Sequence, residues 1–381
     1  MLDNRRLVID SMSEIYNMLK PYADEEFWNF EQVTKQPGDL YVFGRQRLLD
    51  NLNQIRELAV SGNCVIVFDN SAEGAWTAET QLKQLRIDQL VRNGQILVVA
   101  GAELLPEYAH LTHEYFLCKI LDFEENTQAQ NSIVDIFSKT DKSYKFLCLN
   151  GRARPHRKYL YERLKRNQLL DQSLWTMLDS GPTVVKLFDL VENDVDIMAT
   201  PTPIKHLPSG YEVDRYRDPT FGPIVNGRTN LKQELFNREW GEIYLEPAPY
   251  VDTYFSLVTE TICAESNYSF RTEKIAKPLA IGHPFIAVAN AGFYRDLHRL
   301  GFQTFGHVID ESFDQIENHQ ARVDRIVQIV ADLCRQDLAS FLKECYNICK
   351  YNQQHLLELS TQVRHDFPNR FQQFIQQYHN E

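Results

Sequence analysis

Short runs of apolar residues, each followed by a segment with helical spacing, most restrict how this chain can fold. Three of these runs lie in the first part of the chain, at 39–43 (DLYVF), 64–68 (CVIVF) and 96–100 (ILVVA). Strands that are apolar at nearly every position are buried on both faces, as in a parallel sheet covered by helices on both sides. The pattern therefore predicts an α/β fold built on a Rossmann-like sheet.

A second series of the same kind begins after a polar stretch at 124–143. Its apolar runs lie at 144–149 (YKFLCL), 253–262 and 284–289 (PFIAVA). A chain of 381 residues has room for two domains of ordinary size. We expect two Rossmann-like domains and then a helix that can return to the first of them. The expected ranges are 1–140, 141–355 with an insertion at 195–250, and 356–381.

Composition restricts the class of protein further. The sequence has 52 Asp and Glu against 40 Lys and Arg, which gives a net charge of −12. This balance disfavours a protein that coats nucleic acid, but it is compatible with a local basic site. Seven cysteines without a Cys-x-x-Cys pair predict reduced, mostly buried thiols and a cytoplasmic location. No apolar run is long enough to predict a membrane span.

A basic cluster directly follows the apolar run at 144–149. It contains Arg152, Arg154, His156 and Arg157. Backbone amides at the start of a helix bind anions, and Arg side chains beside them strengthen that binding. The carboxyl ends of strands are also where α/β folds bind ligands. We interpret the cluster as a phosphate or pyrophosphate site, and a solvated basic loop is the alternative.

A second polar cluster follows the apolar run at 253–262. Thr272 can cap a helix, and Glu273 suits its first turn. Glu273 and Lys277 are four residues apart, so an ordinary surface ion pair is the structural alternative. Glu260 and Lys274 would lie at the same edge of the sheet as Glu273. A carboxylate there can hold ribose or sugar hydroxyls, and a lysine can neutralise phosphate.

Residues 255–288, FSLVTETICAESNYSFRTEKIAKPLAIGHPFIAV, carry a resemblance to a known group of enzymes. The segment resembles the donor-binding segment of the α1,3-fucosyltransferase and exostosin-like GT-B glycosyltransferases. The shared features are a strand that ends in Glu, a Thr-Glu-Lys helix start and a hydrophobic strand that contains Pro. The continuation at 292–312 is also similar to uncharacterised, often phage-borne, proteins of this general type.

The resemblance implies roles for individual residues. Glu260 corresponds to the strand-end Glu that contacts the donor sugar, and Glu273 to the Glu that holds the nucleoside ribose. Lys274 corresponds to the Lys near the diphosphate. Arg154 and Arg157 look like the basic residues that meet the pyrophosphate from the start of the second domain.

An inverting transfer also needs a base that takes the proton of the attacking hydroxyl. The loop after the run at 64–68 offers Asp69 and Glu73, and the loop after 96–100 offers Glu103. We predict Glu73 and Asp69 as the candidate catalytic bases. A turn role for Asp69 and a helix-start role for Glu73 are the structural alternatives, and a retaining enzyme would need no such base.

The resemblance predicts a GT-B fold, in which two Rossmann-like domains face each other across a cleft. The predicted activity is transfer of a sugar from a nucleotide-diphosphate donor to a hydroxyl acceptor, with no metal ion and no resident cofactor. The acceptor would be a glycan, a lipid-linked sugar, a protein or a hydroxymethylated DNA base. Two alternatives remain open: a non-catalytic module that binds a nucleotide or a glycan, and a phosphate-ester enzyme that uses the arginine cluster.

Overall fold

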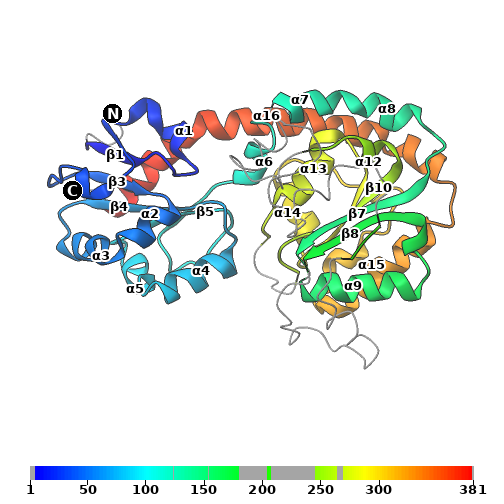
Figure 1. Ribbon diagram of the computed structural model, residues 1–381, viewed down its shortest axis with the longest axis horizontal. Helices are drawn as coiled ribbons and strands as arrows, with labels where there is room; N and C mark the ends of the chain where they lie inside the picture. Colours follow the sequence, from blue (N-terminus) through cyan, green and yellow to red (C-terminus); the bar gives the residue numbers. More distant parts are fainter. Residues whose placement is uncertain are drawn as a thin grey trace, which may run out of the picture. The chain divides into compact units, whose positions relative to one another are not determined.

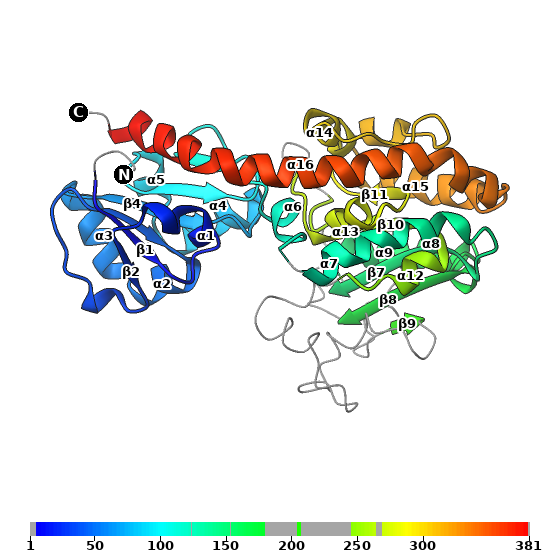
Figure 2. The same ribbon diagram turned by 90° about the horizontal axis from the view of Figure 1, so that it is seen from above.

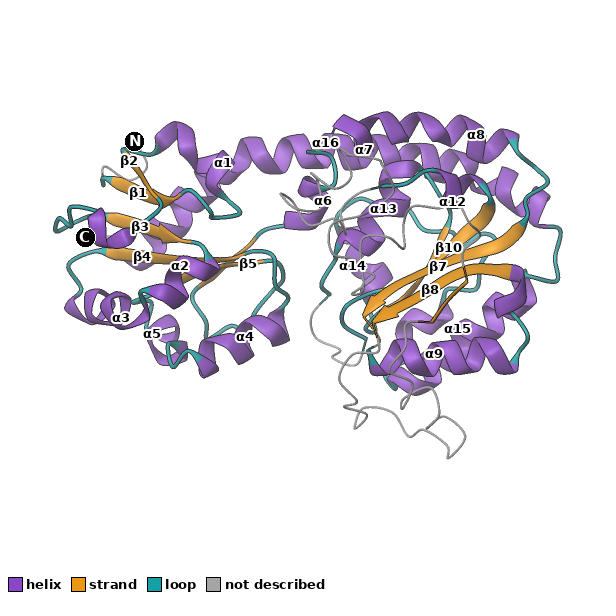
Figure 3. Cartoon of the chain, in the orientation of Figure 1, coloured by secondary structure: helices purple, strands orange, loops and turns teal. Residues whose placement is uncertain are grey.

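The computed structural model forms two compact units, each with its own parallel sheet and helices (Figure 1, Figure 3). Unit 1 contains Met1–Cys118, Tyr268–Arg271 and Glu358–Glu381, and unit 2 contains Lys119–Asn267 and Thr272–Leu357. The predicted mixed α/β class is therefore confirmed. The structure describes residues 5–122, 124–152, 154–179, 204–206, 245–263 and 269–379.

The sheet of unit 1 has six parallel strands in the order β2-β1-β3-β4-β5-β6. Every residue of β1, β3, β4 and β5 is buried, and β3, β4 and β5 correspond to the three apolar runs predicted as buried strands. The connections that leave β1 and β3 run in opposite directions across the sheet, so the switch point of this unit lies between these two strands. The strands are β1 (Leu7–Asp10), β2 (Glu25–Phe27), β3 (Leu40–Phe43), β4 (Val65–Asn70), β5 (Leu97–Ala100) and β6 (His110–Thr112).

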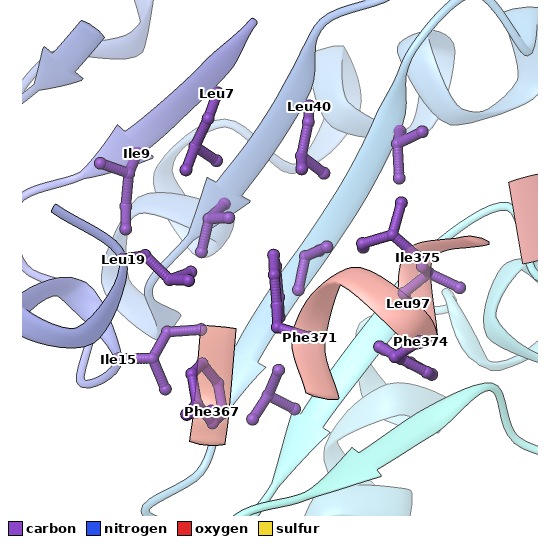
Figure 4. Close-up of a cluster of buried hydrophobic side chains, with 14 of the residues drawn as sticks. Leu7, Ile9, Ile15, Leu19, Leu40, Leu97, Phe367, Phe371, Phe374 and Ile375 are labelled. Atoms are coloured by element: carbon purple, nitrogen blue, oxygen red, sulfur yellow. The ribbon is translucent and has the colours of Figure 1, made fainter. Parts of the chain in front are cut away.

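Short helices connect these strands, and the end of a long C-terminal helix completes the core of unit 1. Phe367, Phe371, Phe374 and Ile375 of that helix pack against strand residues such as Leu40 (Figure 4). The helices of the unit are α1 (Tyr16–Leu19), η1 (Lys20–Tyr22), η2 (Phe30–Gln32), α2 (Arg45–Asp50), α3 (Leu52–Ser61), α4 (Ala75–Gln84), α5 (Asp88–Arg92), α6 (Tyr115–Lys119) and the end of α16 (Leu338–His379).

The sheet of unit 2 has the order β11-β10-β7-β8-β9, and Figure 2 shows the strands in that sequence. All pairs are parallel except β8 with β9. The strands are β7 (Tyr144–Arg152), β8 (Ser173–Asp179), β9 (Ile204–His206), β10 (Thr253–Thr259) and β11 (Phe285–Val288).

Two crossover helices fix the switch point of unit 2. Helix α9 (Pro155–Arg166) connects β7 to β8, and α13 (Glu273–Ile281) connects β10 to β11 in the opposite direction. Because such crossovers are right-handed, α9 and α13 must cover opposite faces of the sheet, as they do in Figure 1. The switch point therefore lies between β7 and β10, where this fold type binds ligands.

The division into units differs from the expected boundary near residue 140. Residues 119–140, which were expected in the first domain, belong to unit 2. Gln353 donates to the carbonyls of Gln130 (3.0 Å) and Ala280 (2.9 Å), and Phe137 packs on Tyr346. The remaining helices of this unit are α7 (Glu124–Ala129), η3 (Gln130–Ser132), α8 (Ile133–Ser138), η4 (Leu170–Gln172), α12 (Ala248–Val251), α14 (Phe293–Arg299), η7 (Ser312–Gln315), α15 (His319–Leu333) and the first part of α16.

Other expectations can be compared with the described residues. The C-terminal helix begins at Leu338, earlier than the expected residue 356. Most of the insertion expected at 195–250 lies outside the described residues. All seven cysteines are buried, as predicted, and none of them forms a disulfide in the structure. Within the described ranges, no helix is long and apolar enough to cross a membrane.

Candidate functional site

The two polar clusters predicted from the sequence lie together at the switch point of unit 2. The Thr259 hydroxyl at the end of β10 donates to the Asn150 side chain in β7 at 2.5 Å. His156 in α9 lies 2.9 Å from the Glu260 carbonyl, and Arg157 donates to the Thr259 carbonyl at 2.9 Å. The carboxyl end of β10 is thus tied directly to the carboxyl end of β7 and to the start of α9.

Glu260 is fully buried, and its carboxylate supports the start of α13. One oxygen accepts from the amides of Thr272 and Ile275, both at 3.2 Å. The other accepts from the Thr272 hydroxyl at 2.6 Å and from the Thr261 amide at 3.2 Å. Burial raises the pKa of this carboxyl, and Lys274 opposes the rise. This geometry is that of a positioning residue, and contact with a donor sugar stays a prediction.

Thr272 caps α13 as predicted, because its hydroxyl accepts from the Lys274 amide. The Lys274 ammonium lies 3.2 Å from that hydroxyl and 2.5 Å from a Glu273 carboxylate oxygen. The side chains of Glu273 and Lys274 are 11% and 21% exposed, so both are mostly buried and only their ends reach solvent. Burial lowers the pKa of Lys274, while Glu273 favours its charged form. The start of α13 therefore presents a cation and a carboxylate side by side.

The three predicted arginines have different surroundings. Arg157 is buried, and it bonds to the carbonyls of Thr259 and Glu260. Arg154 is partly exposed and is the N-cap residue of α9. Arg152 is the last residue of β7, opposite Asp179 of β8, and its side chain lies outside the described part of the structure.

The cations gather around one buried imidazole. Burial lowers the pKa of His156 well below its usual value, and Arg157, Arg154 and Lys274 lower it further. His156 is therefore neutral and adds no positive charge to that of its neighbours. The first amides of α13 already donate to Glu260 and Thr272, and α9 begins with Pro155, so the cationic side chains dominate the charge at this edge of the sheet. Such an arrangement favours a bound anion of the diphosphate type.

The two predicted bases lie in unit 1 at the end of β4, in different environments. Asp69 is buried, and its carboxylate accepts from the Ser13 hydroxyl (2.6 Å) and from the amides of Ile15 and Ser71 (both 3.1 Å). Glu73 is 24% exposed and pairs with Arg45 at 3.0 Å. Asp69 thus holds the loop after β1 in place, and Glu73 is the one of the two that reaches solvent.

The loop after β4, which contains Glu73, is held by contacts that the sequence did not predict. The Gly101 amide donates to the Glu73 carbonyl at 3.0 Å. A Cβ atom at Gly74 would lie 2.6 Å from the Phe270 ring, and one at Gly101 would lie 2.9 Å from it. Arg271, the next residue, forms two hydrogen bonds with Glu114. Nothing in the spacing of the sequence pairs residue 270 with glycines near 74 and 101.

A separate cavity in unit 2 has a volume of about 660 Å³ and is lined mainly by α14 and the segment 306–315. Its carboxylates serve the local fold. Glu311 accepts from the Thr304 hydroxyl and the Phe305 amide, both at 2.7 Å, and Asp314 accepts from the Tyr294 amide at 3.0 Å. The predicted clusters do not contribute to this cavity.

Comparison of the chain with models of known protein families, with curated proteins and with solved structures gave no match. Among the residues that the structure describes, no group of three or more His, Cys, Asp or Glu side chains could hold a metal ion.

Proposed function

We propose that this chain is a glycosyltransferase that moves a sugar from a nucleotide-diphosphate donor to a hydroxyl acceptor. One observation carries the proposal: Arg154, Arg157 and Lys274 gather with Glu273 at the switch point of unit 2. A diphosphate matches the positive charge of these side chains. A ribose offers the neighbouring hydroxyls that a partly exposed carboxylate such as Glu273 can accept.

The residues at this site then divide into two groups. Lys274 and Arg154, which reach the surface, would stabilise the negative charge that develops on the leaving diphosphate. Arg157 is buried, so it would contribute positive charge to the site without reaching its surface, and its hydrogen bonds hold the end of β10 in place. Glu260 keeps the start of α13 in position, so that Glu273 and Lys274 are presented together.

The acceptor side of the proposal belongs to unit 1. The acceptor oxygen attacks the anomeric carbon, the bond from that carbon to the diphosphate oxygen breaks, and the hydroxyl proton passes to Glu73. The exposure of Glu73 supports this role, and its partner Arg45 is itself largely exposed and free to move aside. Asp69 serves as the scaffold of the loop. The GT-B pairing of the two units is part of the same proposal, as is a reaction that needs no metal.

Release of nucleoside diphosphate from a panel of sugar nucleotides, with hydroxyl acceptors present, tests the activity. Replacing Glu73 with Gln removes the base, and general-base catalysis typically contributes about 10²–10⁴-fold. We therefore expect the Glu73→Gln variant to release product about 100-fold more slowly or worse, with donor affinity unchanged. Glu57→Gln, at an exposed position of α3, is the matched control. Equal rates for Glu73→Gln and wild type would contradict the assignment of the base.

A non-catalytic binding module is the second candidate. The observation that favours it is that Asp69, one of the two predicted bases, is fully engaged by its own unit. The same experiment separates the two candidates. A chain that binds a nucleoside diphosphate but releases none from any sugar nucleotide would be a binding module.

A further inference from the structure

Two large apolar side chains are exposed at the carboxyl edge of the sheet in unit 1. Trp28 directly follows β2 and is 62% exposed, and Met12 follows β1 and is 55% exposed. Burying an aromatic side chain of this size is strongly favourable, so a tryptophan left in water at the end of a strand suggests a partner. Trp175, by comparison, is buried.

The strand register brings these two side chains to the same place. Strands β1 and β2 are parallel, with Asp10 opposite Phe27, so Met12 and Trp28 leave the sheet at one edge. The Ser11 amide and hydroxyl both donate to the Phe27 carbonyl at 3.1 Å, which ties the two strand ends together.

This edge is built rigidly around Asp10. That carboxylate is fully buried and accepts from the amides of Met12 (3.0 Å) and Gly44 (3.1 Å). A Cβ atom at Gly44 would lie only 3.0 Å from an Asp10 oxygen and 3.1 Å from the Met12 carbonyl. The ends of β1 and β3, which flank the switch point, are therefore held close together. Met12 and Trp28 follow strand ends that hydrogen bonds hold in place.

A hydrogen-bonding side chain lies beside the exposed aromatic ring. The Arg47 guanidinium lies 5.8 Å from the centre of the Trp28 ring. Its Nε atom has no hydrogen-bond partner and lies 3.9 Å from an Asp10 oxygen. A sugar ring has an apolar face of C–H groups and a rim of hydroxyls. A tryptophan with an arginine beside it matches both features, because the ring can stack on the C–H face and the guanidinium can donate to hydroxyls.

The same edge leads to the proposed base. Trp28 follows β2, Arg45 starts the helix after β3, and Glu73 follows β4 and pairs with Arg45. In the order β2-β1-β3-β4 these positions are three strand spacings apart, about 14 Å. One sugar ring does not span that length, whereas an oligosaccharide does.

We propose that Trp28, with Met12 and Arg47, is a stacking platform for an oligosaccharide acceptor, and that this acceptor runs along the carboxyl edge of the unit 1 sheet to Glu73. The inference rests on the proposed function, which makes the acceptor a hydroxyl compound bound by unit 1. It selects a glycan among the possible acceptors. Nucleic acid is less favoured because the chain carries a net charge of −12.

Binding of the full chain to immobilised mono-, di- and longer oligosaccharides tests the platform, with hydroxymethylated DNA duplexes on the same surface. We expect the wild type to bind longer oligosaccharides and not monosaccharides. Trp28→Ala should weaken that binding about tenfold or more, which is about 1.4 kcal/mol, and Trp28→Phe should restore most of it. Tyr22→Ala is the matched control, because Tyr22 is an exposed aromatic at the amino end of β2.

Stabilisation by nucleoside diphosphates, measured on the same variants, keeps the two proposals distinguishable. If nucleotides stabilise the chain and Trp28→Ala binds oligosaccharides as well as wild type does, the platform is overturned and the transferase proposal stands. Binding to hydroxymethylated DNA in place of oligosaccharides also overturns the platform. If oligosaccharide binding depends on Trp28 and no nucleotide stabilises the chain, the platform stands and the transferase proposal fails.

Discussion

Glu260 and Lys274 share a buried location in which each compensates the charge of the other. Burial raises the pKa of Glu260 and lowers that of Lys274, while each favours the charged form of its partner. Removing Lys274 would leave the buried Glu260 carboxylate without its neighbouring cation, which is destabilising, whereas Lys274 also pairs with Glu273 at 2.5 Å. Arg154 is partly exposed and is therefore a better position for testing ligand binding without loss of the fold, whereas the Glu273 side chain is only 11% exposed.

His113 is expected to make the stability of the fold sensitive to acid. Burial lowers the pKa of His113 to about 3, and Arg370 and Arg364 contribute to the lowering. Its ring packs on Phe367, and its Nδ1 has no hydrogen-bond partner. The unfolded chain binds a proton near pH 6.5 that the folded chain does not bind. The stability contributed by the neutral imidazole is therefore present above pH 6.5 and is lost as the pH falls towards 3.

The corresponding prediction is that His113→Phe reduces this sensitivity. Between pH 6.5 and 5 the histidine should cost the wild type about 2 kcal/mol of unfolding free energy. Urea unfolding at pH 7 and pH 5 measures the difference, and the variant should lose about 2 kcal/mol less than wild type over that interval. An identical loss in both proteins would show that His113 is not buried as a neutral group.

The roles of some residues can be predicted from their neighbours in the sequence. A Thr followed by Glu and Lys before an apolar helix is a capping pattern, and Thr272 does cap α13. The internal role of Asp69 could not be predicted in this way. Its partners Ser13 and Ile15 lie 56 and 54 positions away, and only the pairing of strands brings them together.

Among the elements, the loops after β4 and β5 depend on a close approach of Phe270. At Gly74 the ring of Phe270 is what an added Cβ would meet, whereas at Gly101 the nearest atom is the Ser71 carbonyl oxygen, 2.4 Å away. A flexible side chain can be shortened, and a backbone oxygen cannot. The two glycines should therefore respond differently when Phe270 is made smaller.

A double-mutant cycle measures this difference. Gly74→Ala and Gly101→Ala should each lower the unfolding free energy by about 1–3 kcal/mol, as overpacking does. In a Phe270→Leu background the Gly74→Ala cost should fall by at least about half, and the Gly101→Ala cost should stay close to its full value. Full additivity at Gly74, measured by urea unfolding, would contradict the close packing of Phe270 against this loop.

The elements that the sequence located best are the buried strands. The apolar runs at 39–43, 64–68 and 96–100 correspond to β3, β4 and β5. Assignment of helices to a unit was harder, because amphipathic spacing shows that a helix has a buried face and does not show which sheet buries it. Helices α7 and α8 are an example, because they precede the first strand of unit 2 and still belong to that unit.

For the whole molecule, α16 is the element that belongs to both units. Its 42 residues run without interruption past Pro368. Residues up to Leu357 belong to unit 2, and those from Glu358 onward belong to unit 1. The aromatic residues 367, 371 and 374 supply the apolar surface that completes the unit 1 core (Figure 4). The sequence predicted a C-terminal helix that can return to the first domain, but it did not predict that the same helix begins in unit 2, at Leu338.

Each unit also has its own switch point, and the two differ in chemistry. The switch point of unit 2 gathers cationic side chains, which favours a diphosphate. The edge of unit 1 presents an exposed carboxylate and an exposed tryptophan, which favours a hydroxyl compound. A donor site and an acceptor site are what a transferase requires, and the donor site is the central claim.

The most direct test is a thermal-shift panel of nucleoside diphosphates and their sugar conjugates on the full chain, with Glu273→Ala, Arg154→Ala and, as control, Arg335→Ala. Arg335 is an exposed arginine of unit 2, remote from the switch point. A ligand at 100 times its Kd stabilises the native state by about 2.7 kcal/mol. We expect one nucleotide class to raise the Tm by several degrees in wild type and Arg335→Ala, with the shift lost in the other two variants. No shift with any nucleotide, or a shift that survives in both Glu273→Ala and Arg154→Ala, would contradict a donor site at the switch point of unit 2.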